Sequence, residues 1–149
     1  MRRSILLLCV VGFLVAADDA KDKAAKDELK KFDGAWKAVM AKVDGREATA
    51  EELAKVHVTV EAGQYTVKID DQVVEKGNFT MDPSKKPKQM DVKPVEGQNQ
   101  GKTLLAIYEL NGDDLKICFT ESGKDRPDDF SSDKDSGRVL HVYKRAKAK

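Results

Sequence analysis

The chain has 149 residues, of which 40% are hydrophobic, 36% are charged and 6% are aromatic. This length suits one domain with a hydrophobic core of its own. The 27 basic and 26 acidic side chains are intermixed and leave a net charge of +1. Such a balance gives no electrostatic reason to expect nucleic acid or an anionic membrane surface as a partner.

Residues 1–17 have the pattern of a cleaved secretory signal peptide. Arg2 and Arg3 form a basic start, residues 5–15 are almost wholly apolar, and small residues end at Ala17. The apolar run is shorter than the roughly 20 residues that a stable bilayer anchor takes. We therefore expect cleavage near Ala17 and an exported protein, periplasmic or secreted, without a stable membrane anchor.

Cleavage would leave Cys118 as the only cysteine, because Cys9 lies inside the predicted signal peptide. A single thiol allows no internal disulfide, so stability must come from the core. We expect Cys118 to be a half-buried strand residue. The alternative is a free thiol used for intermolecular pairing or for nucleophilic chemistry.

Residues 18–28 are rich in Lys, Asp and Ala and are predicted to be a flexible charged leader. A helical turn that docks Leu29 and Phe32 is expected to follow. Residues 29–149 contain neither an internal repeat nor a second type of composition, which indicates a single domain.

Beyond Gly34 the apolar residues recur with the period of a β-strand, and two short connections, 62–64 and 111–113, are typical of hairpins. Eight is about the number of strands at which such a sheet closes on itself. We therefore predict an all-β fold, an eight-stranded antiparallel up-and-down barrel. The predicted strands are residues 35–43, 56–61, 65–70, 73–81, 89–95, 103–110, 114–120 and 138–145.

One segment between the first two strands departs from this pattern. Asp44 and Gly45 indicate a turn, and Thr49 and Glu52 have the spacing of a capping box. The sequence therefore predicts a short helix between strands 1 and 2, placed to cover one mouth of the barrel.

Several motifs in fixed order resemble a known family. A Gly-x-Trp at Gly34 and Trp36, after a helical turn, is similar to the lipocalin signature, in which the Trp plugs one barrel end under a basic side chain of the last strand. The resemblance implies this role for Arg145 or Lys144. The other motifs are Lys76-Gly77-x-Phe79, Asp82-Pro83-x-Lys85-Lys86-Pro87, Gly101-Lys102-Thr103-Leu104-Leu105, Ile107-Tyr108-Glu109-Leu110, Asp114-Leu115-x-Ile117-Cys118, Arg126-Pro127 and Tyr143-Lys144-Arg145.

Together these motifs look like the small secreted lipocalin-like domain family described mainly from planctomycete bacteria. The resemblance covers residues 29–145 and implies export and a lipocalin-like barrel. The family has no assigned function, so the resemblance implies no catalytic residue, cofactor or ligand.

Catalysis has one candidate constellation, Cys118 with His141. Alternation places both residues on the outer face of neighbouring strands, opposite the inward Leu140 and Val142, where nothing encloses or orients them. Asp133-x-Asp135 begins like a calcium loop but lacks its later ligands. We therefore expect no enzyme, no metal and no cofactor.

The polar segment before the last strand contains Arg126, Pro127 and Phe130. An Arg-Pro step followed by an apolar residue predicts a docked turn, with Phe130 against a barrel mouth. Its role is either to anchor the loop or to form a binding entrance.

The predicted interior is almost wholly apolar, and strand 103–110 is apolar on both faces, so its outer face should be covered. The number of medium-sized inward side chains slightly favours a filled barrel, whereas the lipocalin-like architecture favours a cavity. Two functions stay open: binding of a small apolar ligand, and a ligand-free structural or protein-interaction module of the cell envelope. We expect a monomer with an unknown protein partner. The candidate ligand-binding residues are Tyr65, Val67, Phe79, Met90, Leu105, Ile107, Ile117 and Phe119.

Overall fold

The computed structural model describes residues 14–147. Most of the predicted signal peptide, including Cys9, therefore lies outside the described residues. The elements in chain order are α1 (Leu14–Lys30), β1 (Gly34–Val43), β2 (Arg46–Glu47), α2 (Ala50–Ala54), β3 (Val56–Glu61), β4 (Gln64–Ile69), β5 (Gln72–Asp82), β6 (Lys88–Glu96), β7 (Leu104–Asn111), β8 (Asp114–Thr120) and β9 (Arg138–Arg145).

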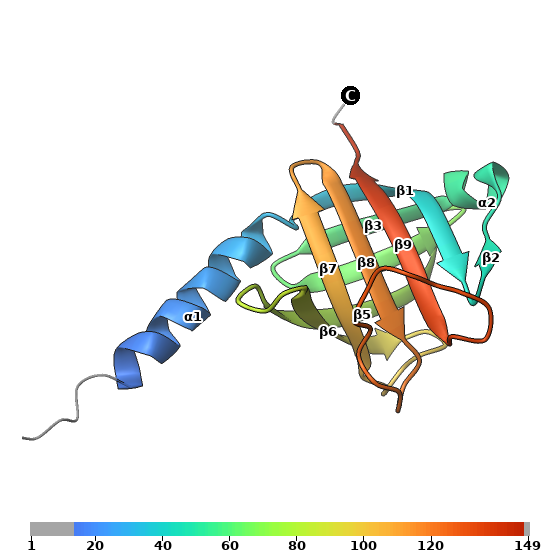
Figure 1. Cartoon of the computed structure of the whole chain (residues 1–149). Coiled ribbons are helices and arrows are strands. Elements are labelled where there is room, and N and C mark those ends of the chain that lie inside the picture. The colour runs from blue at the N-terminus through green and yellow to red at the C-terminus, as the bar shows by residue number, and fades with distance from the viewer. Residues whose placement is uncertain (1–13, 148–149) are drawn as a thin grey trace, which may run out of the picture.

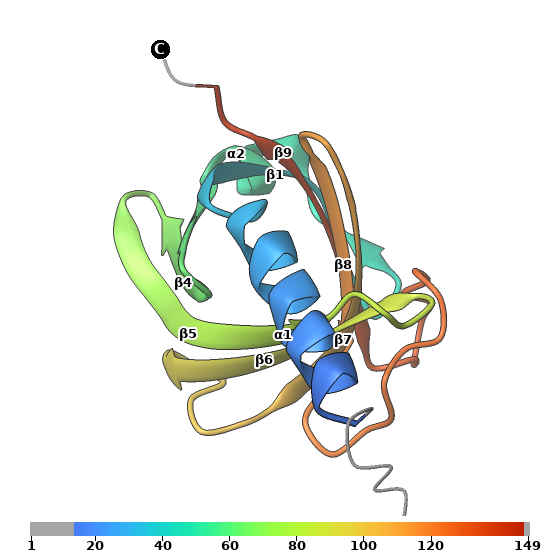
Figure 2. The same ribbon diagram turned by 90° about the vertical axis from the view of Figure 1, so that its left-hand side faces the viewer.

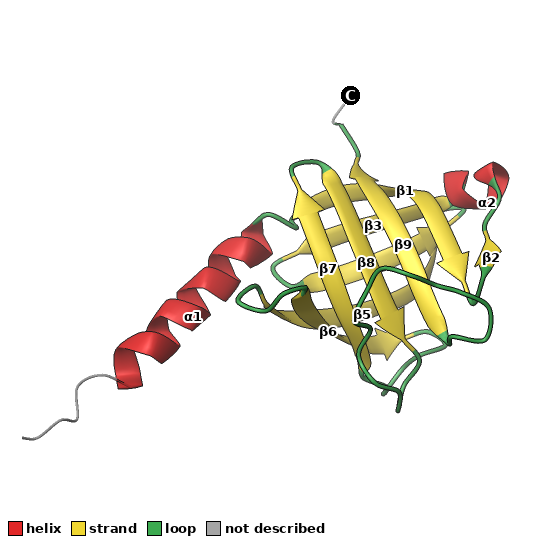
Figure 3. Cartoon of the chain, in the orientation of Figure 1, coloured by secondary structure: helices red, strands yellow, loops and turns green. Residues whose placement is uncertain are grey.

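The strands form a closed antiparallel barrel (Figures 1 and 3). Strands β3 to β9 each pair with their chain neighbours, β1 pairs with β3, and β1 also pairs with β9 to close the sheet. The two-residue β2 pairs only with the end of β1. The wall therefore has eight strands in up-and-down order, as predicted, with a short helix after the first.

Tight turns set the register of the hairpins. The β3–β4 turn places Ala62 at φ 50° and Gly63 at φ 81°, and the β4–β5 turn places Asp70 and Asp71 at φ 50° and 66°. Two successive residues with positive φ match the right-handed twist of paired strands. These turns explain why the connections are so short.

Helix α2 begins with the predicted capping box. The Glu52 amide donates to Thr49 Oγ1 at 3.2 Å, and the Thr49 amide donates to a Glu52 carboxylate oxygen at 2.8 Å. Arg46 adds an ion pair with Glu52 at 2.9 Å. None of the α2 residues is buried, so the helix rests at the rim of the barrel and does not plug it.

Helix α1 includes residues 18–28, where we predicted a flexible leader, because Ala, Lys and Glu favour helix even without a packing partner. Its N-terminal part projects from one end of the barrel (Figures 1 and 2). Its C-terminal end docks on the barrel through Leu29, which is partly buried, and through Phe32 in the turn that follows, which is buried. Among the described residues, neither helix is long and apolar enough to cross a bilayer.

The last turn of α1 is also held by the buried Glu28. Lys88 and Lys31 donate to its carboxylate at 2.6 and 2.9 Å, and the Tyr108 hydroxyl lies at 3.4 Å. Burial alone would raise the pKa of Glu28, but the hydrogen bonds and charges of the two lysines outweigh burial and hold the pKa below its usual range. This carboxylate therefore ties the helix to the barrel.

The inward and outward faces of strand β7 are the reverse of those predicted. Leu104, Ala106 and Tyr108 face the barrel interior, whereas Leu105 and Ile107 face outward. Both faces of β7 are apolar, so alternation alone could not identify the inner one. Leu105 and Ile107, which were predicted to bind the ligand, therefore do not line the barrel interior.

The outer face of β7 to β9 carries a second apolar cluster made of Ile107, Cys118 and Leu140, with Met40 and Phe130 packed against it. Leu140 was predicted to be inward and is in this cluster instead. The long loop 121–137 lies over these strands and supplies Phe130 (Figure 1). The prediction that the outer face of β7 is covered is confirmed.

Arg126 fastens this loop to the barrel wall. Its guanidinium donates to the carbonyl oxygens of Met90 and Ala106 at 2.8 and 2.7 Å and pairs with Asp91 at 2.6 Å. Phe130 packs on the outer wall and not at a mouth. Of the two interpretations of this loop, the structure favours anchoring.

Candidate ligand cavity

One end of the barrel is closed by Trp36, of which only 1% is exposed. The guanidinium of Arg145 lies 4.3 Å from the centre of the Trp36 ring, as expected for a cation–π contact. Arg145 also donates to the carbonyl oxygens of Lys31 and Asp33, both at 2.7 Å. A side chain at Gly34 would come within 3.1 Å of this guanidinium, so glycine leaves room for it. Gly34, Trp36 and Arg145 thus form the predicted plug, with Arg145 rather than Lys144 on the ring.

The barrel interior is hollow and contains a cavity of about 400 Å³. Six of the predicted ligand-binding residues line it: Tyr65, Val67, Phe79, Met90, Ile117 and Phe119. The remaining lining includes the three valines of β3 and Phe32, Trp36, Leu104 and Leu115. The inward side chains are too small to fill a barrel of eight strands, which is why the interior stays open.

The cavity reaches solvent at the end opposite Trp36. Its lining there includes Ile69 and Val74, which are 40% and 42% exposed, and the exposed Gln98. These residues belong to the β4–β5 hairpin and to the β6–β7 connection. Helix α2 contributes no lining residue. A small molecule could therefore enter between these two connections.

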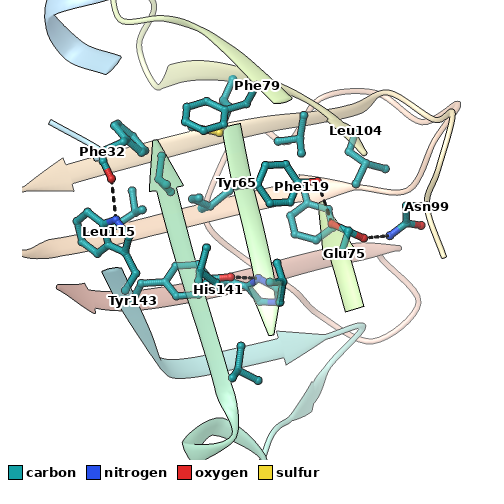
Figure 4. A pocket seen from close by; sticks show the side chains of 18 of the residues that line it. Phe32, Tyr65, Glu75, Phe79, Asn99, Leu104, Leu115, Phe119, His141 and Tyr143 are labelled. Carbon is teal, nitrogen blue, oxygen red and sulfur yellow. Dashed lines mark hydrogen bonds between the residues drawn. The ribbon is translucent and has the colours of Figure 1, made fainter. Parts of the chain in front are cut away.

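A carboxylate, Glu75, stands in the cavity wall (Figure 4). The Tyr65 hydroxyl donates to one of its oxygens at 2.9 Å, and the Asn99 amide donates to the other at 3.3 Å. Burial of the Tyr65 ring, followed by the adjacent Glu75 charge, raises the pKa of its hydroxyl, which therefore stays a donor at neutral pH.

A second polar pair, His141 and Tyr143, lies on the wall formed by β9 (Figure 4). The Tyr143 hydroxyl and His141 Nδ1 are 2.8 Å apart, and Phe119 meets the imidazole edge-on at 5.5 Å. Burial lowers the pKa of His141 to about 4, so the ring is neutral at physiological pH. The predicted outward position of His141 is wrong. Tyr143 pairs with the inward Ala38 of β1, and alternate residues of a strand face the same side, so His141 faces inward as well.

Cys118 and His141 are therefore on opposite faces of the sheet. Cys118 pairs with Leu140 on the outer side, and Ile117 pairs with His141. The thiol is fully buried and donates to the Ser131 carbonyl at 3.5 Å. The structure does not bring the two candidate groups together as a nucleophile and its base.

We expect the Cys118 thiol to react only after the loop 121–137 detaches. Burial raises the pKa of the thiol to about 11, so little thiolate exists at pH 8. Alkylation by iodoacetamide, followed by peptide mass mapping, should label Cys118 at least about a hundredfold more slowly in the folded protein than in denaturant. Equal rates in the two conditions would contradict this burial.

The acidic loop shows no metal site. Among residues 14–147, no group of three or more His, Cys, Asp or Glu side chains is arranged to hold a metal ion. Asp133 instead uses its backbone carbonyl to accept from the Ser136 hydroxyl at 2.6 Å.

The comparisons with protein-family models, curated proteins and solved structures gave no match.

Proposed function

We propose that the protein is an exported, lipocalin-like binding protein that carries a small apolar ligand in the barrel cavity. The observation that carries this proposal is the cavity of about 400 Å³, which is lined mainly by apolar side chains and open at one end. Ligand sites in proteins are concave, mostly apolar and furnished with a few polar groups. The cavity has all three properties.

The plug of Trp36 and Arg145 also supports a lipocalin-like architecture, because it matches the signature that the resemblance implies. The rival function, a ligand-free interaction module, depends on a filled interior. Export is supported by the basic and apolar pattern of the N-terminal residues.

Filling the cavity should abolish binding. The Val67 side chain lines the cavity in the middle of β4, and the neighbouring Thr66 points to the outer face. We expect the neutral fluorophore N-phenylnaphthylamine to bind the wild-type protein and to bind Val67→Phe at least about tenfold more weakly, because the larger ring occupies the space. Fluorescence titration measures both affinities.

Thr66→Phe is the matched control, because it adds the same ring on the opposite face of the same strand. It should bind the probe as the wild type does, and thermal melting should show that both variants fold. Equal loss of binding in the two variants, or no binding by the wild type, would count against the cavity as a ligand site. A native mass spectrum of protein purified from the exported fraction would then identify the carried ligand by its mass.

A further inference from the structure

Within residues 14–147, the polar groups that line the cavity include one acidic side chain and no basic one with a formal charge. Among the described residues that line it, Glu75 is the only one with a formal charge at neutral pH, since His141 is neutral there. None of the ion pairs among the described residues involves Glu75. The cavity therefore presents one negative charge without a cation to balance it.

The two partners of Glu75 are neutral donors, Tyr65 and Asn99. Each carboxylate oxygen accepts one hydrogen bond from them, whereas a carboxylate offers about four acceptor positions in all. The remaining positions are free for a ligand. Glu75 is half-buried and has no cationic side chain beside it among the described residues, so a cation that enters the cavity would pair with it where water screens the attraction less than in bulk solvent.

The strand around Glu75 is built to hold this carboxylate in place. Gly77 is on the same face of β5, and a Cβ there would approach the Tyr65 hydroxyl within 2.6 Å. Glycine thus leaves the space in which the Tyr65 ring crosses β5 and reaches Glu75 (Figure 4). Asn99 approaches the carboxylate from the β6–β7 connection, at the open end of the cavity.

Apart from Glu75, Gln98, Asn99 and the neutral His141–Tyr143 pair, the lining of the cavity is apolar and aromatic. Its aromatic residues include Phe119, Phe79 and, at the closed end, Trp36. Aromatic faces attract cations and accommodate hydrocarbon, whereas an anionic head group would meet the Glu75 charge in a poorly hydrated space. A fatty acid is therefore the wrong electrostatic match for this site.

We propose that the cavity binds an amphiphile with a protonated amine head group, which contacts Glu75 near the mouth while its hydrocarbon body extends toward Trp36. This inference rests on the proposed binding function and specifies the chemical class of the ligand. Primary amines are protonated at neutral pH, as the lysine side chain is. Charge-assisted hydrogen bonds from such a head group to a carboxylate are about twice as strong as neutral ones.

Three probes with the same hydrocarbon chain and different head groups test this proposal: decylamine, decanol and decanoate. Each is titrated calorimetrically into the full chain at neutral pH, below the concentration at which it forms micelles. We expect decylamine to bind at least about tenfold more tightly than decanoate, with decanol in between. In Glu75→Gln, the affinity for decylamine should fall at least about tenfold, and the affinity for decanol should change less than about threefold.

Glu61→Gln is the matched control, because it removes the same charge from an exposed position on β3. It should leave all three affinities unchanged. If decanol binds but decanoate equals or exceeds decylamine, or if Glu75→Gln retains the preference for the amine, the head-group inference is wrong and the binding function stands. If none of the three probes binds, the proposed binding function fails and the inference fails with it.

Discussion

Replacing Trp36 with alanine should lower the free energy of unfolding by about 3–5 kcal/mol, as is typical when a buried aromatic side chain is truncated. The ring is 1% exposed, its Nε1–H donates to the Phe32 carbonyl at 2.8 Å, and its face carries the Arg145 guanidinium. Truncation removes all three interactions and leaves a void at the closed end of the barrel. Urea denaturation followed by circular dichroism measures the change.

Trp36→Phe serves as the control for this prediction. It keeps an aromatic face under Arg145 and loses only the hydrogen bond to Phe32, so its cost should be well below that of alanine. A loss under about 1 kcal/mol for Trp36→Ala would show that the plug contributes little to stability.

Acid should destabilise the protein between pH 6.5 and pH 4 through His141. The unfolded histidine has a pKa near 6.5 and binds a proton in this interval, whereas burial keeps the pKa of the folded residue at about 4. Since the unfolded state binds more protons, the free energy of unfolding falls as the pH falls. The loss is at most about 3 kcal/mol and is complete below the folded pKa.

The measurement is urea denaturation at several pH values in wild type and in His141→Gln, whose amide can also form a hydrogen bond with the Tyr143 hydroxyl. The variant should lose most of the slope between pH 6.5 and pH 4.5. Below pH 4.5 both proteins should lose stability together, because the lowered pKa of Glu28 makes its contribution disappear as acid protonates it. His57→Gln, at an exposed position on β3, should keep the wild-type slope. An unchanged slope in His141→Gln would contradict the neutral buried imidazole.

The features that the sequence predicted are those that nearby residues determine. The capping box at Thr49 and the short turns at Ala62–Gly63 and Gly112–Asp113 depend on interactions within a few positions. The number and order of strands follow from alternation between such turns. For that reason the eight-stranded barrel could be predicted from residue patterns, whereas the plug of Trp36 and Arg145 was implied only by the family resemblance.

The faces of β7 and β9 could not be predicted in this way. Ile107 and Leu140 look like interior residues by local pattern, but a distant loop supplies Phe130 to cover them on the outside. Which face is inward depends on pairing between β1 and β9, the two ends of the domain. Alternation within one strand contains no information about that pairing.

The polar part of the cavity was missed for two different reasons. Glu75 is two and four positions from Gly77 and Phe79, a spacing that puts all three on one face of β5, but a lone charge in a strand is usually solvated, and Glu75 was not among the predicted ligand-binding residues. Asn99 lies in a connection without periodicity, and only the folded β6–β7 loop brings it to Glu75. The hollow interior depends on the sum of many side-chain volumes against the diameter of the closed sheet, which no single residue reveals.

Closure of the barrel by β1 and β9 has a consequence for the order in which the chain folds. The hairpins from β3 to β8 form between chain neighbours and can assemble before the first and last strands meet. The β1–β9 seam joins Trp36 with Arg145 across almost the whole domain, so the sheet keeps two unpaired edges until these strands pair. Pairing of β1 with β9 therefore completes the plug and closes the cavity at the same moment.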